Sequence, residues 1–436
     1  MNTQTSGSQA VLDRAVRKAF WRLLPLCFLC YVIAYVDRAN VSFAALTMGK
    51  DLAGFDKKVF GFGAGVFFWG YFLLEIPGTV LVEKWSARKW ITRIMITWGI
   101  IAAATSMVTT PMQFYVLRFL LGLAEAGFFP GMIVYLTHWF PIKARAKAVA
   151  AFIIATPTAQ IVSAPISGTI VDSMNYLGLH GWQWLYIVWG LPAVILGVVV
   201  FFAMTDRPRQ AKWLTLEERD TLEAELEREK AAAKKKRRMT LLEGLSHPKV
   251  LLLCLVYVLG VMANYSLDFF LPTILKTWYK IDIKQIKWLT VLPPMLALAG
   301  QLFMGWHSDL RKERRLHTVI PMLIAAAALI LVSISQGNLA LTIILFMVAA
   351  AGIKSYQPSF WALPPLLLTE TAGAASIGLI NSVGNLGGFF GPTMMGSVKS
   401  YPVGLSILGG GLILAALIVF FLGVGHKVTS AAHEPA

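Results

Sequence analysis

The chain of 436 residues is 57% hydrophobic, and only 14% of its residues are charged. Soluble globular proteins usually carry about 25% charged residues, so the composition excludes that class and indicates a membrane protein with many spans. The formal net charge of +16 does not indicate nucleic-acid binding, because the basic residues lie in short loops and form no mixed basic and aromatic surface. Cys27, Cys30 and Cys254 all lie in apolar segments, so neither a disulfide framework nor a zinc site is expected.

Apolar runs of about 20 residues, each long enough to cross about 30 Å of hydrocarbon, recur along the chain. They predict twelve membrane-spanning helices, at residues 21–46, 59–82, 90–108, 112–136, 146–171, 183–204, 249–272, 286–307, 317–335, 339–366, 373–397 and 402–424. Basic residues precede the first span and follow the second, fourth and eighth, so both termini are expected in the cytoplasm. The loop after the seventh span conflicts with this pattern, because it contains Lys276, Lys280, Lys284 and Lys287.

A long polar interruption divides the chain into halves. We expect an N-terminal six-helix bundle at residues 1–205, a cytoplasmic linker at 206–248 and a C-terminal six-helix bundle at 249–436. Within the linker, Thr215-Leu-Glu-Glu218 has the pattern of a capping box, which predicts a charged helix that continues to about Lys230. We interpret the basic run at 234–238 as part of a solvated linker, with binding of anionic lipid headgroups as the alternative.

The two halves share a sequence repeat. The loop after the second span, which contains Glu83 and Arg88, matches the loop after the eighth, which contains Asp309 and Arg314. Two pairs of prolines keep nearly the same spacing: Pro130 with Pro358, and Pro165 with Pro392. A nearly constant offset predicts two pseudo-symmetric bundles related by an axis along the membrane normal, with the binding site between them.

Two charged residues lie side by side inside the first predicted span. Asp37 and Arg38 are well away from either end of the span, where each charge costs about 2.5–3.5 kcal/mol on insertion scales. Neighbouring side chains on a helix point about 100° apart. We therefore expect Asp37 and Arg38 to find their partners on different helices.

Arg118 and Glu125 lie seven residues apart, so both project from one face of the fourth span. Together with Asp37 and Arg38 they place two acids and two bases at membrane depth. Protonation of either acid would free an arginine, which is the minimum requirement for a proton-driven switch. The alternative is a permanent network of ion pairs that locks the helices together, although four buried charges are an expensive way to do so.

Polar and aromatic side chains near the middle of other spans are candidates for lining a pocket. They are Tyr35, Tyr71, Gln160, Ser359, Trp361, Asn381 and Asn385. Amides and hydroxyls suit a hydroxylated or carboxylated solute, and aromatic walls suit a ring or a sugar face. The alternative for each residue is a hydrogen bond between helices or an interfacial anchor.

These motifs resemble those of a known family. The loops that begin at Glu83 and Asp309 resemble the signature of the major facilitator superfamily. Four further segments resemble its anion:cation symporter family, and within it the bacterial branch that imports sugar acids, tartrate, phthalate and similar carboxylates: Asp37-Arg-Ala-Asn40, Arg118 to Gly131, Trp139-Phe-Pro141 and Phe360-Trp-Ala-Leu-Pro364. The first loop departs from the pattern, with Glu83 in place of the usual Asp and Ser86 in place of the usual Gly.

The resemblance implies roles for particular residues. It implies proton carriage by Asp37 and Glu125, a contact between Arg38 and the substrate carboxylate, and organisation of the acids by Arg118. It also implies substrate contacts at Tyr35, Tyr71, Gln160, Trp361 and Asn385. The loop residues Glu83, Arg88, Asp309 and Arg314 correspond to the family's gating motif.

Asp268 in the seventh span and Lys354 in the tenth are charged where the family is commonly uncharged. One interpretation is that they pair with each other. The other is that Lys354 meets a second carboxylate of the solute, which would favour a dianion such as an aromatic dicarboxylate.

The sequence therefore predicts an all-α membrane protein of twelve transmembrane helices in two six-helix bundles. Its predicted function is proton-coupled import of an organic carboxylate across a bacterial inner membrane by alternating access, as a monomer without a cofactor. A uniporter or exchanger is the alternative, and a receptor that does not transport is disfavoured because no signalling domain is visible. No phosphate-binding loop, nucleophile or cofactor motif indicates an ATPase or an enzyme. His138 and His307 are expected to be isolated from other ligands, so no metal site is predicted.

Overall fold

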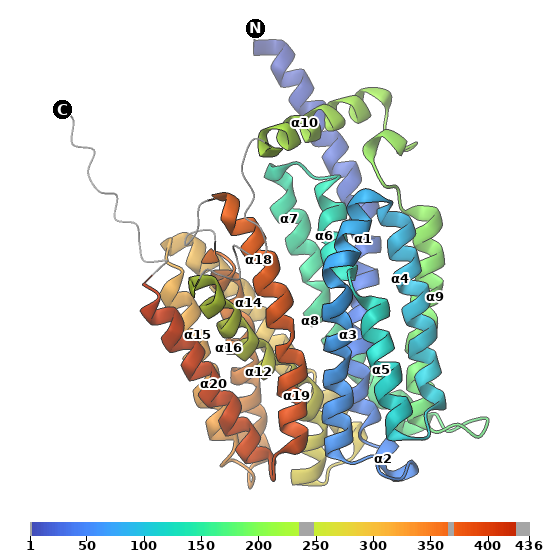
Figure 1. The fold of residues 1–436 in the computed structure, drawn as a ribbon, viewed down its shortest axis with the longest axis vertical. Helices are drawn as coiled ribbons and strands as arrows, with labels where there is room; N and C mark the ends of the chain where they lie inside the picture. Colours follow the sequence, from blue (N-terminus) through green and yellow to red (C-terminus); the bar gives the residue numbers. More distant parts are fainter. Residues whose placement is uncertain (1, 235–247, 365–369, 424–436) are drawn as a thin grey trace, which may run out of the picture. The chain divides into compact units, whose positions relative to one another are not determined.

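The computed structural model describes residues 2–234, 248–364 and 370–423, and within these ranges the chain is helical and contains no strand (Figure 1). The first part contains α1 (Asn2–Ala44), α2 (Met48–Asp51), α3 (Lys57–Lys84), α4 (Ala87–Ala104), η1 (Thr105–Met107), α5 (Pro111–Glu125), α6 (Phe128–Thr137), α7 (Ile142–Ile153), α8 (Ala155–Ser173), α9 (Gly181–Ala203), η2 (Pro208–Gln210) and α10 (Leu216–Lys234). The second part contains α12 (Pro248–Tyr279), α13 (Ile283–Leu289), α14 (Leu292–Arg311), α15 (Arg315–Val332), α16 (Leu339–Phe360), α18 (Glu370–Asn385), α19 (Gly387–Ser397) and α20 (Tyr401–Phe421).

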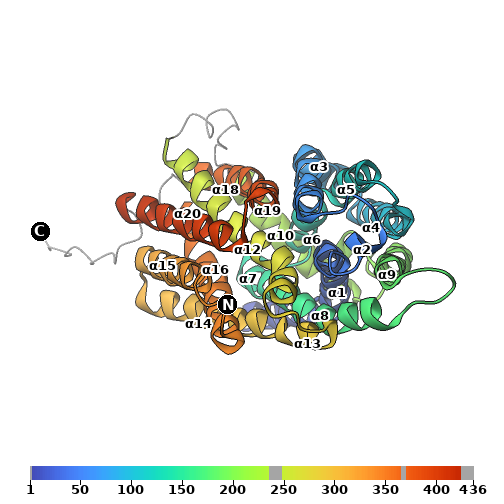
Figure 2. The same ribbon diagram turned by 90° about the horizontal axis from the view of Figure 1, so that it is seen from below.

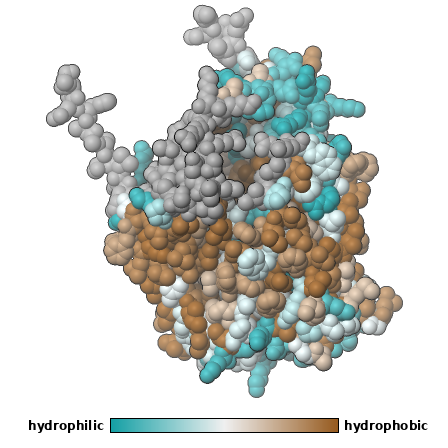
Figure 3. Space-filling view, viewed as in Figure 1, coloured by the Kyte–Doolittle hydropathy of each residue, from teal (hydrophilic) through white to brown (hydrophobic). Residues whose placement is uncertain are grey.

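The predicted membrane spans coincide with these helices. Among the described residues, ten helical stretches are long and apolar enough to cross a membrane. They match ten of the predicted spans, and the other two, 59–82 and 373–397, fall on α3 and on α18 with α19. On the face drawn in Figure 3, hydrophobic residues cover the middle of the helices and hydrophilic residues gather around α10. The prediction of an all-α membrane protein is confirmed.

Four spans that the sequence predicted as continuous are broken within the described residues. The fifth divides into α7 and α8 at Ile154, and the eighth divides into α13 and α14 between Leu289 and Leu292. The fourth divides into α5 and α6 at Gly127, whose φ of 82° lies in the left-handed region that favours glycine. The eleventh divides into α18 and α19 at Leu386. Hydrophobicity alone does not reveal such breaks, because the apolar run continues through each of them.

The chain divides into two compact units that are discontinuous in sequence. The first unit comprises Met1–Asn40, Trp69–Gln160 and Met174–Arg237, and the second comprises Val41–Phe68, Ile161–Ser173 and Arg238–Ala436. Two short segments of the N-terminal half, 41–68 and 161–173, thus belong to the same compact unit as the C-terminal half. The domain boundaries expected at residues 205 and 249 stay a prediction.

Glycines allow close helix packing within the first unit, where α4 runs alongside α9 (Figure 1 and Figure 2). A Cβ atom at Gly99 of α4 would lie 2.7 Å from the carbonyl oxygen of Gly190 of α9, and a Cβ atom at Gly190 would lie 2.7 Å from the carbonyl oxygen of Gly99. The two backbones are therefore in direct contact. Small residues that admit such close approach are typical of interfaces between membrane helices, where dispersion drives association.

The described part of the linker packs against the first unit. The predicted capping box is present, because the Thr215 hydroxyl accepts a hydrogen bond from the Glu218 amide and the Glu218 carboxylate accepts one from the Thr215 amide. Lys18 of α1 pairs with Glu218 at 2.8 Å, and Arg145 of α7 pairs with Glu229 at 3.2 Å. These contacts fix α10 along its length, whereas residues 235–238 of the basic run lie outside the described residues.

The core of the second unit is built around α12 and α16. α16 packs against α14 and α15, and α12 packs against α18, α19 and α20. Tyr356 and Phe360 of α16 are fully buried, and the ring of Tyr257 stacks on that of Phe360 at 5.5 Å. The aromatic cluster places the end of α16 beside α12 at Tyr257, about two helical turns before Asn264.

Valine at Gly99 should lower the melting temperature of the detergent-solubilised protein. Its side chain would force α4 away from the Gly190 backbone, and overpacking of this kind costs about 1–3 kcal/mol. Gly410 of α20 is the matched control, because a Cβ atom there would have no neighbour within 4 Å. Equal melting temperatures for Gly99→Val and Gly410→Val would contradict the close packing of α4 on α9.

The contact between α10 and α1 should weaken at acidic pH. Desolvation raises the pKa of Glu218, but the hydrogen bonds from Lys18 and from the Thr215 amide outweigh it, and the net pKa lies below the usual value of 4.5. A carboxylate with a lowered pKa stabilises the folded state above its unfolded pKa, and the stabilisation disappears as the pH falls through the folded pKa. Half of the Lys18 side chain is exposed, so the effect is below about 1 kcal/mol.

We expect amide hydrogen exchange in Leu216–Lys234, corrected for intrinsic rates, to accelerate between pH 7 and about pH 3. The Glu218→Gln variant should exchange faster already at pH 7 and change little on acidification. Identical pH dependence in the variant and the parent would show that Glu218 does not hold the helix.

Candidate functional site

The charged residues of the first predicted span lie buried inside the first unit. Asp37 is 1% exposed and Arg38 is 8% exposed. The indole Nε1 of Trp98 on α4 donates a hydrogen bond to Asp37 Oδ2 at 3.1 Å. Arg38 donates from Nε to Oε1 of Glu125 at 2.7 Å, and its second guanidinium nitrogen lies 2.5 Å from the same oxygen. Asp37 and Arg38 therefore contact different helices, as the helical geometry predicted.

Arg118 and Glu125 share the buried face of α5, and each is 0% exposed. Arg118 interacts electrostatically with Asp37, Glu125 and the phenol of Tyr186 on α9. Glu125 is the last residue of α5, immediately before the break at Gly127. The break ends the helix at the carboxylate that pairs with Arg38, so local backbone geometry positions the acid.

A third acid belongs to the same site. The guanidinium of Arg38 lies over the Tyr71 ring, with 4.9 Å between its central carbon and the ring centroid. Glu75 follows Tyr71 by one helical turn, is 3% exposed and interacts electrostatically with that phenol. The first unit thus gathers three carboxylates, of Asp37, Glu75 and Glu125, around two arginines.

Sequence reasoning missed three members of this site, Glu75, Trp98 and Tyr186. Glu75 carried a usable signal, because an acid inside a predicted span is rare and generally functional. Trp98 and Tyr186 carried none, since aromatic residues in apolar runs are mostly packing. Their polar atoms became informative only when the structure showed them beside Asp37 and Arg118.

Two more predicted pocket residues belong to the first unit. Tyr35 precedes Asp37 by two residues in α1 and is 5% exposed. Gln160 lies on α8 and is half-buried. Their roles as substrate contacts stay predictions.

The predicted residues of the second unit gather on α12, α16 and α18. Lys354 of α16 interacts electrostatically with Asp268 of α12. Asn264 donates a hydrogen bond to Asp268 at 3.2 Å. These contacts favour the interpretation in which Lys354 pairs with Asp268, and the Asn264 amide supports the same carboxylate.

The remaining candidates of the second unit lie on α16, directly after it, and on α18. The ring of Trp361 lies 4.8 Å from that of Tyr257, directly after α16. Ser359 is fully buried, whereas Asn381 and Asn385 are half-buried on α18. Their roles in binding stay predictions.

The repeated loops make different contacts in the two halves. Ser86 caps α4, accepts a hydrogen bond from the Lys89 amide and donates one to Asp206 at 2.8 Å. The Arg88 amide donates to the same carboxylate. The serine that departs from the family pattern therefore provides a helix cap and an anchor for the linker. In the second loop Arg314 pairs with Asp309 at 2.6 Å, whereas the side chain of Glu83 lies outside the described residues.

The expectation that His307 is isolated is wrong. His307 Nδ1 lies 2.7 Å from Nε2 of His317, whose Nδ1 lies 2.6 Å from the Glu313 carboxylate. His317 is ten residues further along and on the next helix, so no sequence pattern indicated this contact. Among the described residues, no group of three His, Cys, Asp or Glu side chains is arranged to hold a metal ion.

Removal of one partner of the Arg38–Glu125 pair should destabilise the protein more than removal of both. A single buried charge left without its partner costs about 3–5 kcal/mol, and replacement of both partners by apolar residues avoids most of this cost. We expect Glu125→Leu and Arg38→Met each to lower the melting temperature. The double variant should lower it by less than the sum of the two single decreases. The exposed pair of Glu225 and Arg228 is the control, for which a single substitution should change little. Additive effects at Arg38 and Glu125 would contradict the energetic coupling.

Comparisons with known proteins agree with this architecture. The model of the Major Facilitator Superfamily matches residues 27–392. A "putative tartrate transporter" of Agrobacterium vitis is 43% identical over 430 residues, which cover 97% of this chain and 98% of the relative. A "putative metabolite transport protein NicT" of Pseudomonas putida is 39% identical and covers 93% of each chain.

The solved structure of the xylose transporter XylE from E. coli has a TM-score of 0.75 and 14% identity, with coverage of 94% of this chain and 98% of that one, which shows a shared fold. The matched family consists of transporters and not of enzymes. The chain belongs to the Major Facilitator Superfamily, in the same branch as these bacterial transporters.

Proposed function

We propose that the protein is a proton-coupled symporter that imports an organic carboxylate across a bacterial inner membrane by alternating access. The single observation that carries the proposal is the buried contact between Arg38 and Glu125. It joins the cation best suited to bind a carboxylate solute to an acid that can take up a proton. The relatives with tartrate in their names support an organic anion as the solute.

Coupling follows from competition for Arg38. While Glu125 is ionised, it occupies the donors of the guanidinium. Protonation of Glu125 removes the negative charge and weakens its hold on Arg38, which can then bind a solute carboxylate. Because each event favours the other, the proton and the anion bind with positive cooperativity, and linkage makes that effect reciprocal.

The other acids extend this arrangement. Asp37 accepts a hydrogen bond from Trp98 and interacts electrostatically with Arg118. Loss of its charge would strengthen the interaction of Arg118 with Glu125. Glu75 gives the site one more acid than base. A site with an excess acid can hold a proton even while both arginines remain charged, which suits a carrier that takes up protons together with an anion.

A uniporter or exchanger of the same solutes is the competing function. Such a protein needs a cation for the anion, but it has little need of three acids at membrane depth, where each acid is costly. The number of buried carboxylates therefore favours the symporter. The solute itself stays open between a sugar acid and an aromatic or dicarboxylic acid.

The same proposal includes the orientation and state of the protein. We place both termini in the cytoplasm, because the basic clusters at Arg88 and Arg314 follow even-numbered predicted spans, on the side where the positive-inside rule places the termini. We propose a monomer whose partners are the solute, protons and the lipid bilayer.

Asp37→Asn and Glu125→Gln should bind solute but lose its accumulation against a gradient. A thermal-shift screen of organic acids on the purified protein identifies the solute, and uptake is then measured in proteoliposomes with and without an imposed pH gradient. We expect both variants to exchange labelled for unlabelled solute and to show no response to the gradient. Glu227→Gln, on the exposed face of α10, should behave like the parent. Gradient-driven accumulation by both site variants would refute the proton role.

A further inference from the structure

The lysines that conflict with the charge pattern of the loops have specific partners in the structure. Lys276, near the end of α12, donates a hydrogen bond to the carbonyl oxygen of Leu46, just after α1. Lys287 of α13 donates to the hydroxyl of Thr169 on α8 at 2.7 Å. Both donors belong to the C-terminal half of the sequence and both acceptors to the N-terminal half, within the second unit. These two hydrogen bonds thus connect segments from the two halves of the sequence.

A third lysine makes the same kind of contact in the reverse direction. Lys57, the first residue of α3, donates to the carbonyl oxygens of Val398 at 2.5 Å and Lys399 at 3.3 Å, just after α19. Its ammonium also lies 5.5 Å from the ring centroid of Tyr401. These bonds involve chain segments next to the ends of odd-numbered predicted spans or the starts of even-numbered ones. With the proposed orientation, these segments belong to the membrane face opposite the termini.

Close backbone packing accompanies the lysine bonds. A Cβ atom at Gly61 of α3 would collide with the carbonyl oxygen of Pro392 on α19, and one at Gly396 would lie 2.6 Å from the carbonyl oxygen of Lys57. A Cβ atom at Gly168 of α8 would likewise collide with the side chain of Lys287. The two halves can meet this closely at this face only because glycine lies at these positions.

We propose that Lys57, Lys276 and Lys287 form a latch that closes the outer face of the transporter and must release whenever solute enters from that side. The inference goes beyond the proposed solute and proton roles. It rests only on the proposed orientation, with both termini in the cytoplasm, which makes the latched face the outer one.

The chemistry of these lysine bonds suits a contact that opens in every transport cycle. Each acceptor is a neutral carbonyl or hydroxyl oxygen, so no buried carboxylate loses its partner when the bond breaks. The released ammonium is strongly hydrated on its flexible stem, which favours opening into water. In the closed state the same ammonium makes a charge-assisted hydrogen bond, stronger than a bond between neutral groups.

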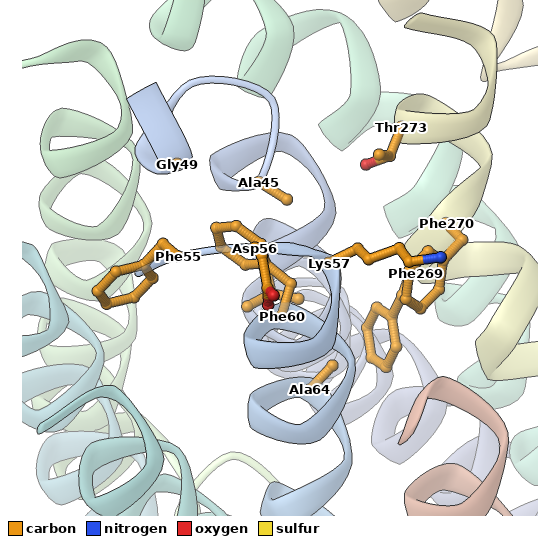
Figure 4. A pocket seen from close by; sticks show the side chains of 11 residues that line it. Ala45, Gly49, Phe55, Asp56, Lys57, Phe60, Ala64, Phe269, Phe270 and Thr273 are labelled. Carbon is orange, nitrogen blue, oxygen red and sulfur yellow. The ribbon is translucent and has the colours of Figure 1, made fainter. Parts of the chain in front are cut away.

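A cavity beside the latch provides a position for a reporter. It has a volume of about 120 Å³ and is lined by Phe55, Phe60 and Ala64 on the N-terminal side and by Phe269 and Phe270 of α12 (Figure 4). Lys57 forms part of its wall. Ala64 is 1% exposed, and a cysteine there has room for its sulfur in the cavity. Water and a thiol reagent should reach this cysteine only after the latch opens.

The test uses an Ala64→Cys variant in which Cys27, Cys30 and Cys254 are replaced by alanine. A membrane-impermeant maleimide is added to the outside of right-side-out vesicles, and the rate at which it labels the cysteine at position 64 is measured. Replacement of the three latch lysines by methionine removes the donors and should raise the rate about tenfold or more, because charge-assisted bonds are lost from the closed state only. Replacement of the same lysines by arginine keeps a donor and should leave the rate near that of the parent.

The matched control replaces Lys58 and Lys284, exposed lysines next to the latch, by methionine. It removes charge from the same face and should leave the rate unchanged. Equal rates in the methionine triple variant and this control would overturn the latch, as would labelling only from the inner face. If the triple variant fails to fold, Gly61→Leu provides a second route, since its side chain would hold α3 away from α19 and should also speed labelling. The assay needs no solute, so its result is independent of uptake measurements.

Discussion

The structure depends on the compensation of charge inside the first unit. Arg118 and Glu125 are fully buried and Arg38 is nearly so, a position in which an uncompensated ion would be too costly to retain. The direct contact between Arg38 and Glu125 compensates the charges of both, and Arg118 interacts electrostatically with Asp37 and Glu125. If one acid is neutralised, the positive charge that it compensated must therefore find another negative partner in the site. In the proposed symport, that requirement would couple the proton to the anion.

The surrounding helices hold this site in place. α5 ends at Glu125 because Gly127 adopts a left-handed backbone, and Trp98 reaches Asp37 from α4, which glycines bring close to α9. At the start of the linker, the Asp206 carboxylate binds Ser86 and the Arg88 amide. The charged centre is thus supported by rigid packing in the membrane and by a polar anchor at its end.

Much of this organisation could be predicted from the sequence, for a physical reason. Hydrocarbon tolerates only helices with internally satisfied backbones, so apolar length predicts the spans, and it makes charges such as Asp37 and Glu125 conspicuous. The break at Gly127 was not predictable, because the apolar run does not change there. Glu75 was overlooked as a single acid in a long span.

Other features depend on contacts that leave no pattern in the sequence. Lysines such as Lys276 conflicted with the charge pattern of the loops, but their carbonyl acceptors could not be identified from the sequence. Every residue offers the same backbone carbonyl oxygen, whatever its side chain. The contact of His307 with His317 likewise depends on how two helices meet. The roles of Gln160, Trp361 and Asn385 require a bound solute and remain predictions.

The central claim is that solute and proton cross the membrane together. The most direct measurement places a pH-sensitive dye inside proteoliposomes and adds solute outside, without any pH gradient and with the membrane potential clamped. The account predicts that inward movement of the solute acidifies the interior, at a rate proportional to solute entry. Entry of labelled solute with no change of internal pH would contradict it.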